Sequence, residues 1–301
     1  MTGIRPMATG ELDAVAGLAW SALSLDAGEA GALVTHLAAP PPDRDWAALV
    51  TPDMDGVAFV STSATTPGAG HVDLLAVHPA ARGHGLGKAL VHAAEDWLHD
   101  RDVHEVRLAG NPPCYAWPGV DVRYTPAVCL AESLGYQRYR TAWNMTVDLT
   151  ALPTAQEPDL ARLAEAGVEL HSAHDPGDRA SVAGFVRDHW NDSWAWEVEQ
   201  STGCHYAVRD GEILGFAAWG TRPGWFGPMG TAEQSRGLGV GRVLLRRCLN
   251  DQAATGQREA QIAWVGPIHF YARAIGARVE RVFWSFRRSL TDPGLPETEE
   301  S

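Results

Sequence analysis

Two short glycine-rich segments hold the residues best suited to binding an anion. They are Arg82-Gly83-His84-Gly85-Leu86-Gly87 and Arg236-Gly237-Leu238-Gly239-Val240-Gly241. Glycine lets a backbone turn tightly and approach a ligand without a Cβ clash. The N–H groups of such a turn, together with the N-terminus of a following helix, form an anion site whose natural occupant is a pyrophosphate.

The spacing of the glycines excludes two common nucleotide-binding loops. Neither segment continues into Gly-Lys-Ser or Gly-Lys-Thr, so neither is a Walker A loop. A dinucleotide-binding loop has the spacing G-x-G-x-x-G, whereas both segments have G-x-G-x-G. A single loop of this kind is weak evidence, because glycine-rich turns are common.

The two segments belong to a long internal repeat. When Arg82 is aligned with Arg236, an offset of 154 residues, the three glycines of one segment fall on those of the other. Leu90 then falls on Leu244. The offset is about half of the chain, which indicates a duplicated domain rather than one large fold.

The same elements are expected around each loop, in the order strand, strand, loop, helix, strand, helix, strand. Hydrophobic periodicity and turn residues predict each of them. In the first copy they are Val57–Ser61, Val72–Val77, the loop, Leu86–His99, Glu105–Ala109, Pro126–Ser133 and Tyr139–Val147. In the second they are Ile213–Gly220 after an Asp210-Gly211 hairpin turn, Trp225–Thr231, the loop, Val240–Thr255, Ala260–Val265, Pro267–Ile275 and Arg278–Arg287.

The sequence therefore predicts a mixed α/β fold with two tandem domains, each a mixed sheet flanked by helices. The expected domains are residues 1–150 and 151–290, joined by a linker at Asp148–Asp159 with a short helix at Leu160–Ala166. Residues 291–301 are acidic and rich in proline, so a disordered tail is expected.

Composition and charge argue against several classes of protein. The chain of 301 residues has 24 Lys and Arg against 37 Asp and Glu, a net charge of −13, which disfavours nucleic acid as a partner. Neither a transmembrane segment nor a secretory signal is expected, so no membrane association is predicted. The four cysteines form no C-x-x-C pair and the histidines show no ligand spacing, so we expect no disulfide, no metal site and a cytoplasmic location.

The repeated unit resembles the GCN5-related N-acetyltransferases (GNAT). Both loops resemble the [RQ]-x-x-G-x-[GA] signature of this family, and Leu74–Ala81 is similar to its fourth strand and turn. The N-terminal IRPMATGELDAV is similar to its first strand and helix, and Thr125–Tyr136 and Ile268–Ala277 to its late helix. The resemblance covers nearly the whole chain twice, and the tandem layout resembles mycothiol synthase at the level of architecture.

The resemblance implies acetyl-CoA (coenzyme A) as the cofactor. The fourth and fifth strands are expected to splay and leave a slot for the pantetheine arm, which would pair with the fourth strand like an added strand. Pro228, which has no N–H to donate, fits a local break in the pairing of that strand. The expected cofactor-binding residues are Leu75, Ala76, Val77, Arg82, Gly83, His84, Gly85, Leu86, Gly87 and Lys88, and in the second copy Met229, Gly230, Thr231, Arg236, Gly237, Leu238, Gly239, Val240, Gly241 and Arg242.

Tyr271 is the expected catalytic residue. Acetyl transfer needs a proton for the leaving thiolate, and in this family a tyrosine on the late helix often gives it. Tyr271 stands five residues before Gly276, where the family often has four, which puts its rotation on the helix in question. The positions five and four before Gly135 are Leu130 and Ala131, which cannot donate a proton, so the second domain is the expected catalytic one. A packing role for Tyr271 is the alternative.

The proton acceptor is left open. His71 and Asp73 alternate on a strand of the first copy, either as a functional pair or as a pair facing solvent. The candidates in the second copy are water, His269, Glu197, Glu199 and His205.

Two further segments combine aromatic residues with polar ones. His189–Glu199 forms either a pocket for a cationic amine or a core helix with an acidic solvated side. Asn111–Tyr124 has too much proline for regular structure, and it either covers the slot of the first copy or forms a contact between domains.

The expected function is acetyl-CoA-dependent N-acetylation of a primary amine of a small molecule, by direct attack. A non-catalytic acyl-CoA-binding sensor or interaction module and a protein lysine acetyltransferase are the alternatives. The sequence says nothing of the acceptor's identity or the oligomeric state.

Overall fold

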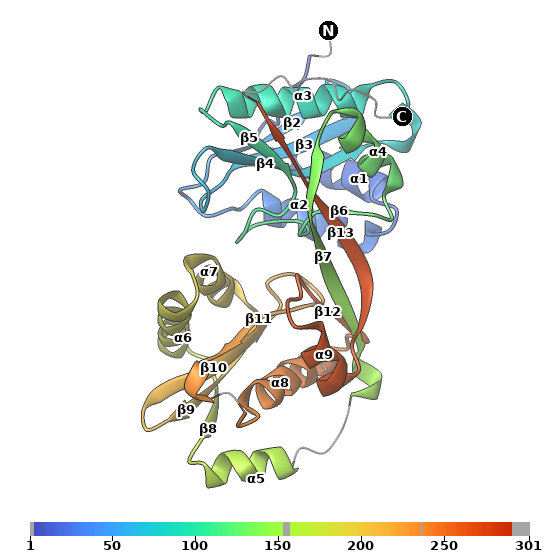
Figure 1. The fold of residues 1–301 in the computed structure, drawn as a ribbon. Helices are drawn as coiled ribbons and strands as arrows, with labels where there is room; N and C mark the ends of the chain where they lie inside the picture. Colours follow the sequence, from blue (N-terminus) through green and yellow to red (C-terminus); the bar gives the residue numbers. More distant parts are fainter. Residues whose placement is uncertain (1–2, 153–156, 236, 291–301) are drawn as a thin grey trace, which may run out of the picture. The chain divides into compact units, whose positions relative to one another are not determined.

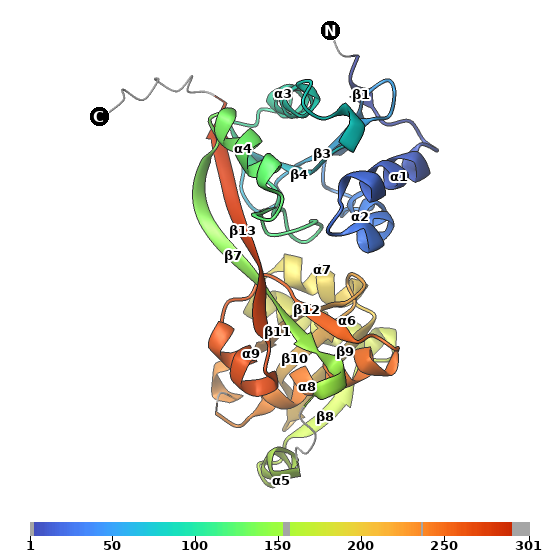
Figure 2. The same cartoon turned by 90° about the vertical axis from the view of Figure 1, so that its right-hand side faces the viewer.

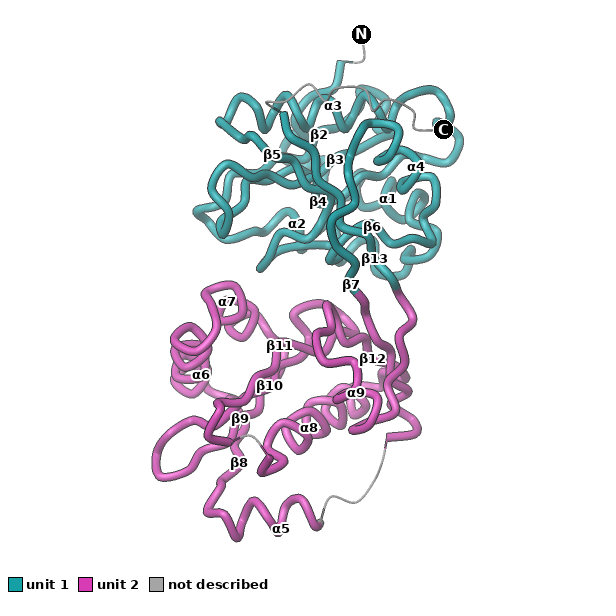
Figure 3. The backbone as a smooth tube through the Cα atoms, viewed as in Figure 1, with its two compact units in different colours: residues 1–142, 282–301 teal, residues 143–281 magenta. Residues whose placement is uncertain are grey.

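The computed structural model describes residues 3–152, 157–235 and 237–290, which fall into two compact units (Figure 1). Unit 1 comprises residues 1–142 and 282–301, and unit 2 comprises residues 143–281 (Figure 3). The tail from residue 291, residues 153–156 of the expected linker, and Arg236 lie outside the described residues.

Unit 1 is a mixed sheet with helices on both faces. Its strands follow the order β1-β2-β3-β4-β5-β13, and neighbours are antiparallel except for the parallel pair β4 and β5. Helix α3 covers one face, and α1 and α2 cover the other (Figure 2). The strands are β1 (Arg5–Pro6), β2 (Trp46–Val50), β3 (Gly56–Thr62), β4 (Ala69–Val77), β5 (Glu105–Leu108), β6 (Val120–Asp121), the start of β7 (Gln137–Asp148) and the end of β13 (Arg278–Ser289). The α-helices are α1 (Leu12–Ala22), α2 (Ala30–Leu37), α3 (Leu86–His99) and α4 (Thr125–Ser133).

Unit 2 repeats this arrangement. Its strands follow the order β7-β12-β11-β10-β9-β8, with β11 and β12 parallel and the other neighbours antiparallel. Helix α8 lies on one side of the sheet, and α6 and α7 lie on the other (Figure 1). The strands beside β7 are β8 (Glu169–Ser172), β9 (Gly203–Arg209), β10 (Glu212–Trp219), β11 (Trp225–Thr231) and β12 (Glu259–Ile262). The α-helices are α5 (Glu157–Glu165), α6 (Pro176–His189), α7 (Asp192–Gln200), α8 (Val240–Ala254) and α9 (Ile268–Ile275).

The expected elements of the repeat are present within one or two residues at most ends. Helix α3 has the bounds predicted from its apolar stripe, and α8 ends one residue earlier than expected. Asp210 and Gly211 both have positive φ, which is the geometry of the predicted hairpin turn between β9 and β10. The expected short helix before the second copy is α5.

The compact units do not divide the chain at the expected residue 150. The end of β13 pairs with β5 in unit 1, from Phe286 opposite Leu108 to Ser289 opposite Glu105. The end of β7 pairs with β12 in unit 2, from Met145 opposite Ile262 to Asp148 opposite Glu259. The sheet of each unit thus includes a strand end from the other copy's sequence.

Side chains of the end of β13 hold it in unit 1. Phe286 is 1% exposed and belongs to the apolar core under α3. Arg288 donates to the buried Glu95 of α3 at 3.0 Å, and the Tyr136 hydroxyl donates to the same carboxylate at 2.8 Å. The C-terminal strand therefore contributes both core volume and a partly buried ion pair to unit 1.

Within the described residues, none of the helices has the length and apolar character needed to cross a bilayer.

The exchange of strand ends predicts which of the two units a core mutation destabilises. Phe286→Ala removes a buried ring from unit 1 and is expected to cost about 3–5 kcal/mol there, whereas Met145→Ala on β7 is expected to cost about 2–5 kcal/mol in unit 2. Amide hydrogen exchange should show faster exchange in β3 for Phe286→Ala and in β10 for Met145→Ala. The opposite pattern would contradict the assignment of these strand ends.

Candidate functional site

The first glycine-rich loop joins β4 to α3 through two left-handed residues. Gly83 and Gly85 have φ of 81° and 82°, and Gly85 is the N-cap of α3. A Cβ on Gly85 would meet nothing within 4 Å, so glycine is needed there for its φ and not for space. No side chain caps α3, which leaves its first N–H groups for a ligand or water. The Arg82 guanidinium donates to the carbonyl oxygens of Val77 and Ala22, at 3.1 and 2.8 Å, and fixes the loop.

Beside this loop, β4 parts from β5. The two strands pair from Ala69 to Val72 of β4, and the pairing ends where Val72 meets Leu108. Beyond it, Ala109 takes a positive φ of 61° and turns the chain away from β4. Residues 74–77 of β4 therefore pair with β3 on one edge only, and Asp73 lies at the register shift between Val72 and Leu74. The expected splay of the fourth and fifth strands is confirmed in the first copy.

A cavity of about 580 Å³ lies at this splay. Its walls are the open edge of β4, the glycine-rich loop, one side of α4 and the segment before α4. Of the residues expected to bind the cofactor in the first copy, all except His84 line it. Trp117 and Gly119 from the proline-rich segment line it as well, so that segment covers the slot of its own unit.

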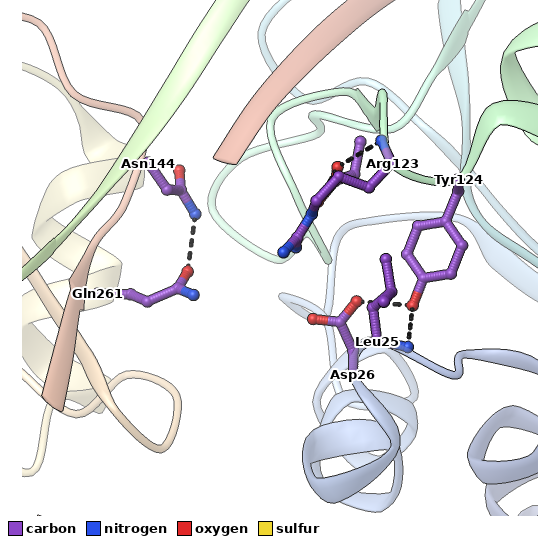
Figure 4. A network of polar contacts seen from close by, with 7 residues as sticks. Leu25, Asp26, Arg123, Tyr124, Asn144 and Gln261 are labelled. Atoms are coloured by element: carbon purple, nitrogen blue, oxygen red, sulfur yellow. Dashed lines mark hydrogen bonds and ion pairs between the residues drawn. The ribbon is translucent and has the colours of Figure 1, made fainter. Parts of the chain in front are cut away.

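Tyr124 fixes the start of α4 at the cavity wall. Its hydroxyl donates to Asp26 Oδ2 at 2.8 Å and accepts from the backbone N–H of Leu25 at 3.1 Å (Figure 4). Tyr124 and Leu25 both line the cavity. These partners are far apart in the sequence, so sequence reasoning did not single out Tyr124.

His71 and Asp73 are both buried, at 3% and 5% exposure, and the alternative of a solvent-facing pair is wrong. His71 Nδ1 lies 2.9 Å from the carbonyl oxygen of Ala109, and burial lowers the pKa of His71 to about 3, so the ring is neutral. Asp73 Oδ2 accepts a hydrogen bond from Ser61 Oγ at 2.5 Å. Burial raises the pKa of Asp73 to about 7, against the lowering effects of the Ser61 hydrogen bond and the Arg44 charge.

Asp73 lies between two cavities. It lines the large cavity, and it also lines a small one of about 10 Å³ together with Arg44 and Cys114. Among the residues that the structure describes, the buried Asp73 Oδ1 and Arg44 Nε have no hydrogen-bond partner, and the small cavity has room for about one water molecule near both residues. The Arg44 guanidinium donates to the carbonyl oxygens of Asn111, Pro112 and Cys114, which shapes the proline-rich segment around it.

The second glycine-rich loop has the same backbone. Gly237 and Gly239 have φ of 86° and 92°, and Gly239 is the N-cap of α8. β11 pairs with β12 only at Trp225 and Phe226, so its remainder, including Met229, Gly230 and Thr231, is open on that edge. The register of β11 with β10 shifts across Pro228, which confirms the expected break in pairing. Among the expected cofactor residues, Leu238 lies in the loop, and Val240, Gly241 and Arg242 form the first turn of α8.

Tyr271 is buried on α9, with 7% exposure. Its ring meets Phe226 of β11 and Phe270 edge-on, with centroids 6.3 and 5.1 Å away. Burial raises the pKa of Tyr271 well above its usual value, so the phenol keeps its proton throughout the neutral range. Gly276 is the C-cap of α9 with a left-handed φ of 69°, as expected.

The other candidates for a base in the second copy differ in their surroundings. His205 lies 2.8 Å from Ser172 Oγ and 2.7 Å from Asp251 Oδ2, so both ring nitrogens are engaged. Glu199 pairs with Arg187 at the surface, and His269 is exposed. Glu197 is half-buried, and burial raises its pKa to about 8.

The aromatic residues of His189–Glu199 pack on the sheet of unit 2. Trp190 and Trp194 stack with centroids 6.0 Å apart, and both meet the buried Phe216 edge-on. A Cβ on Gly230 would lie 2.4 Å from the Trp190 ring, so Trp190 covers β11 at that glycine. Among the residues that the structure describes, no group of three or more His, Cys, Asp or Glu is arranged to hold a metal ion.

Residues 27–117 and 170–277 match the acetyltransferase (GNAT) family. The mycothiol acetyltransferase of a Nocardioides species is 27% identical over 212 residues, which cover 62% of this chain and 68% of that relative. The mycothiol acetyltransferase of Salinispora arenicola is 35% identical over 106 residues, which cover 35% of this chain and 30% of that relative.

A solved structure shows the same fold. The tandem GNAT protein from the clavulanic acid biosynthesis pathway superposes with a TM-score of 0.70 at 19% identity, covering 98% of this chain and 100% of that chain. The family resemblance seen in the sequence is thus confirmed for each copy. Since the two matched regions make up more than half of its residues, the chain belongs to the GNAT family and is an N-acetyltransferase.

Proposed function

We propose that the chain transfers the acetyl group of acetyl-CoA to a primary amine of a small molecule, and that coenzyme A lies in the cavity of unit 1. The observation that carries this proposal is the cavity of about 580 Å³ between the open edge of β4 and the glycine-rich loop. Its size is in the range of small-molecule and cofactor sites.

The residues present fit coenzyme A at both ends of the cavity. The uncapped first turn of α3 and the open space above Gly85 suit a pyrophosphate. The edge of β4 from Asp73 to Val77 offers backbone donors and acceptors to the amide groups of a pantetheine arm, as an added strand would use them.

A small amine is the acceptor class that the comparisons and the charge favour. The relatives named mycothiol acetyltransferase support a small-molecule acceptor. The net charge of −13 attracts amines, which are cationic in solution at neutral pH. The amine must lose a proton before its lone pair can attack a carbonyl carbon, so the site needs a proton acceptor.

Asp73 is the proton acceptor that we propose for unit 1. Acetyl-CoA supplies the activated acyl carbon and a thiolate leaving group. The amine nitrogen forms the new N–C bond, the C–S bond breaks with its electron pair going to sulfur, and Asp73 takes the proton from nitrogen. A carboxyl group with a pKa of about 7 is matched to this task, because it is ionised above neutral pH and still basic enough to hold a proton.

A second candidate places turnover in unit 2, with Tyr271 as the proton donor to the thiolate. The observation that favours it is the position of Tyr271 against Phe226, at the point where β11 and β12 stop pairing. The raised pKa keeps the phenol protonated and ready to donate. Glu197, with a pKa of about 8, is the matching acceptor candidate in this unit.

The proposed function is tested by screening primary amines for thiol release from acetyl-CoA with the full chain. Release with a small amine, and with no lysine peptide, is the expected result. Release with lysine peptides alone would favour a protein acetyltransferase. Binding of coenzyme A without release by any amine would favour a sensor.

Asp73→Asn keeps the shape of the side chain and its acceptor for Ser61 but cannot take a proton. We expect the turnover number to fall about 10²–10⁴-fold, with coenzyme A affinity unchanged. In the wild type, the turnover number should rise as the pH increases through about 7, because the Asp73 carboxylate forms there. This rise with pH should be absent in Asp73→Asn.

The melting temperature shows whether a loss of turnover in Asp73→Asn comes from misfolding. The folded pKa of Asp73 lies above its ordinary 3.8, so the ionised carboxylate lowers wild-type stability progressively from about pH 4 to pH 7. Asp73→Asn should therefore melt no lower than the wild type at pH 8. Unchanged turnover in this variant would contradict the role of Asp73.

Tyr271→Phe tests the second candidate. If unit 2 carries turnover, removing only the hydroxyl should lower the turnover number of the full chain about 10²–10⁴-fold while the ring keeps its packing against Phe226. Steady-state thiol release measures it. A turnover number equal to that of the wild type would leave Tyr271 a packing residue.

A further inference from the structure

The two glycine-rich loops differ in what covers them. In unit 1, a Cβ on Gly85 would meet nothing within 4 Å. In unit 2, a Cβ on the equivalent Gly239 would lie 2.5 Å from Nη2 of Arg162, a residue of α5. Arg162 Nε also donates to the carbonyl oxygen of Leu238 in the loop at 3.0 Å. The Arg162 side chain of α5, the helix before β8, thus covers the second loop.

Helix α5 also brings an anion to the N-terminal turns of α8. Asp159 Oδ1 accepts from Arg162 Nη2 at 2.6 Å. Asp159 Oδ2 lies 3.5 Å from Nη1 of Arg242 and 3.5 Å from Nη1 of Arg246, both on α8. The Asp159 side chain is 12% exposed although α5 is a surface helix, so its carboxylate faces inward.

This arrangement is the one that a phosphate group would need. Guanidinium groups bind carboxylates and phosphates with the same geometry, and the N-terminus of a helix adds a favourable dipole for either anion. A carboxylate of the chain itself therefore has the partners that a phosphate of coenzyme A would take at this loop.

Within the described part of unit 1, no ion pair places a carboxylate at the loop in this way. The residues aligned with Arg242 and Arg246 are Lys88 and His92. His92 pairs with Glu95 of its own helix at 2.9 Å, and Lys88 lines the cavity. The first loop opens onto that cavity, and no residue of α5 belongs to unit 1.

We propose that α5 is an internal occupant of the second loop, with the Asp159 carboxylate in the place of a coenzyme A phosphate among Arg162, Arg242 and Arg246. Unit 2 then binds coenzyme A only when the Asp159 carboxylate is displaced from these guanidinium groups, and the resting chain holds one coenzyme A, in unit 1. This inference rests on the proposed use of coenzyme A, and it departs from the expectation of one cofactor in each copy.

Titration calorimetry with coenzyme A and the full chain tests the proposal by counting sites. The wild type should show one site, lost in Gly85→Glu and unaffected by the matched Gly239→Glu. Gly85 and Gly239 have φ of 82° and 92°, so the two substitutions impose similar backbone strain. A count of zero in the wild type would overturn the proposed function itself, whereas a count of two would overturn only the occupancy of the second loop.

Removal of the internal anion should create the second site. Asp159→Ala leaves three guanidinium groups without their carboxylate, so a phosphate gains partners and the count should rise from one to two. Addition of Gly239→Glu to this variant should return the count to one. Glu165→Ala removes an exposed acid from the same helix and should leave the count at one.

Asp159→Asn provides a second variant that keeps the shape of the side chain while removing its charge. Asp159→Asn should also raise the number of coenzyme A sites to two. It replaces Asp159→Ala in the test if circular dichroism shows that Asp159→Ala is not folded. A count that stays at one in a folded Asp159 variant would contradict the proposal.

Discussion

The backbone of β4 beyond Val72 sets the constraint on which the rest of unit 1 depends. A strand has hydrogen-bonding groups on both edges, and those turned away from water need partners. From Leu74 to Val77, β3 pairs with one edge, while β5 has already parted from the other. A ligand with amide groups of its own can satisfy that edge. The loop at Gly85 and one side of α4 line the cavity beside this edge, so a ligand can lie where a neighbouring strand would otherwise pair.

The separation of β4 from β5 also determines the surroundings of Asp73 and therefore its pKa. A carboxyl group at the first residue past the last β4–β5 pair lies on the border between the core and the cavity. Burial makes its charged form costly, while Ser61 and Arg44 stabilise that form, and the balance leaves its pKa near neutrality. Duplication kept the open strand edge and the left-handed glycines in unit 2, but there Arg162 and Asp159 cover the loop. The two copies thus share a backbone and differ in the side chains around it.

Local patterns in the sequence were sufficient to predict most elements. The apolar stripe of α3, the Asp210-Gly211 turn and the C-cap at Gly276 each depend on residues within a few positions. The exchange of strand ends was not predictable, because Phe286 and Leu108 are far apart and any apolar strand suits that edge. The sequence left open whether Asp73 is buried for a similar reason: Arg44 and the proline-rich segment that enclose it come from elsewhere in the chain. The role proposed for Asp159 could not be predicted from the sequence, since an acid with an arginine three residues later is common on surface helices.

We propose that a cofactor completes the open edge of β4. Amide hydrogen exchange of the wild-type chain, with and without saturating coenzyme A, tests this proposal. Ligand pairing along this edge predicts slower exchange at residues 74–77 and 83–88 when coenzyme A is present, with residues 229–241 unchanged. Slower exchange confined to residues 229–241, or no change at residues 74–77, would contradict it.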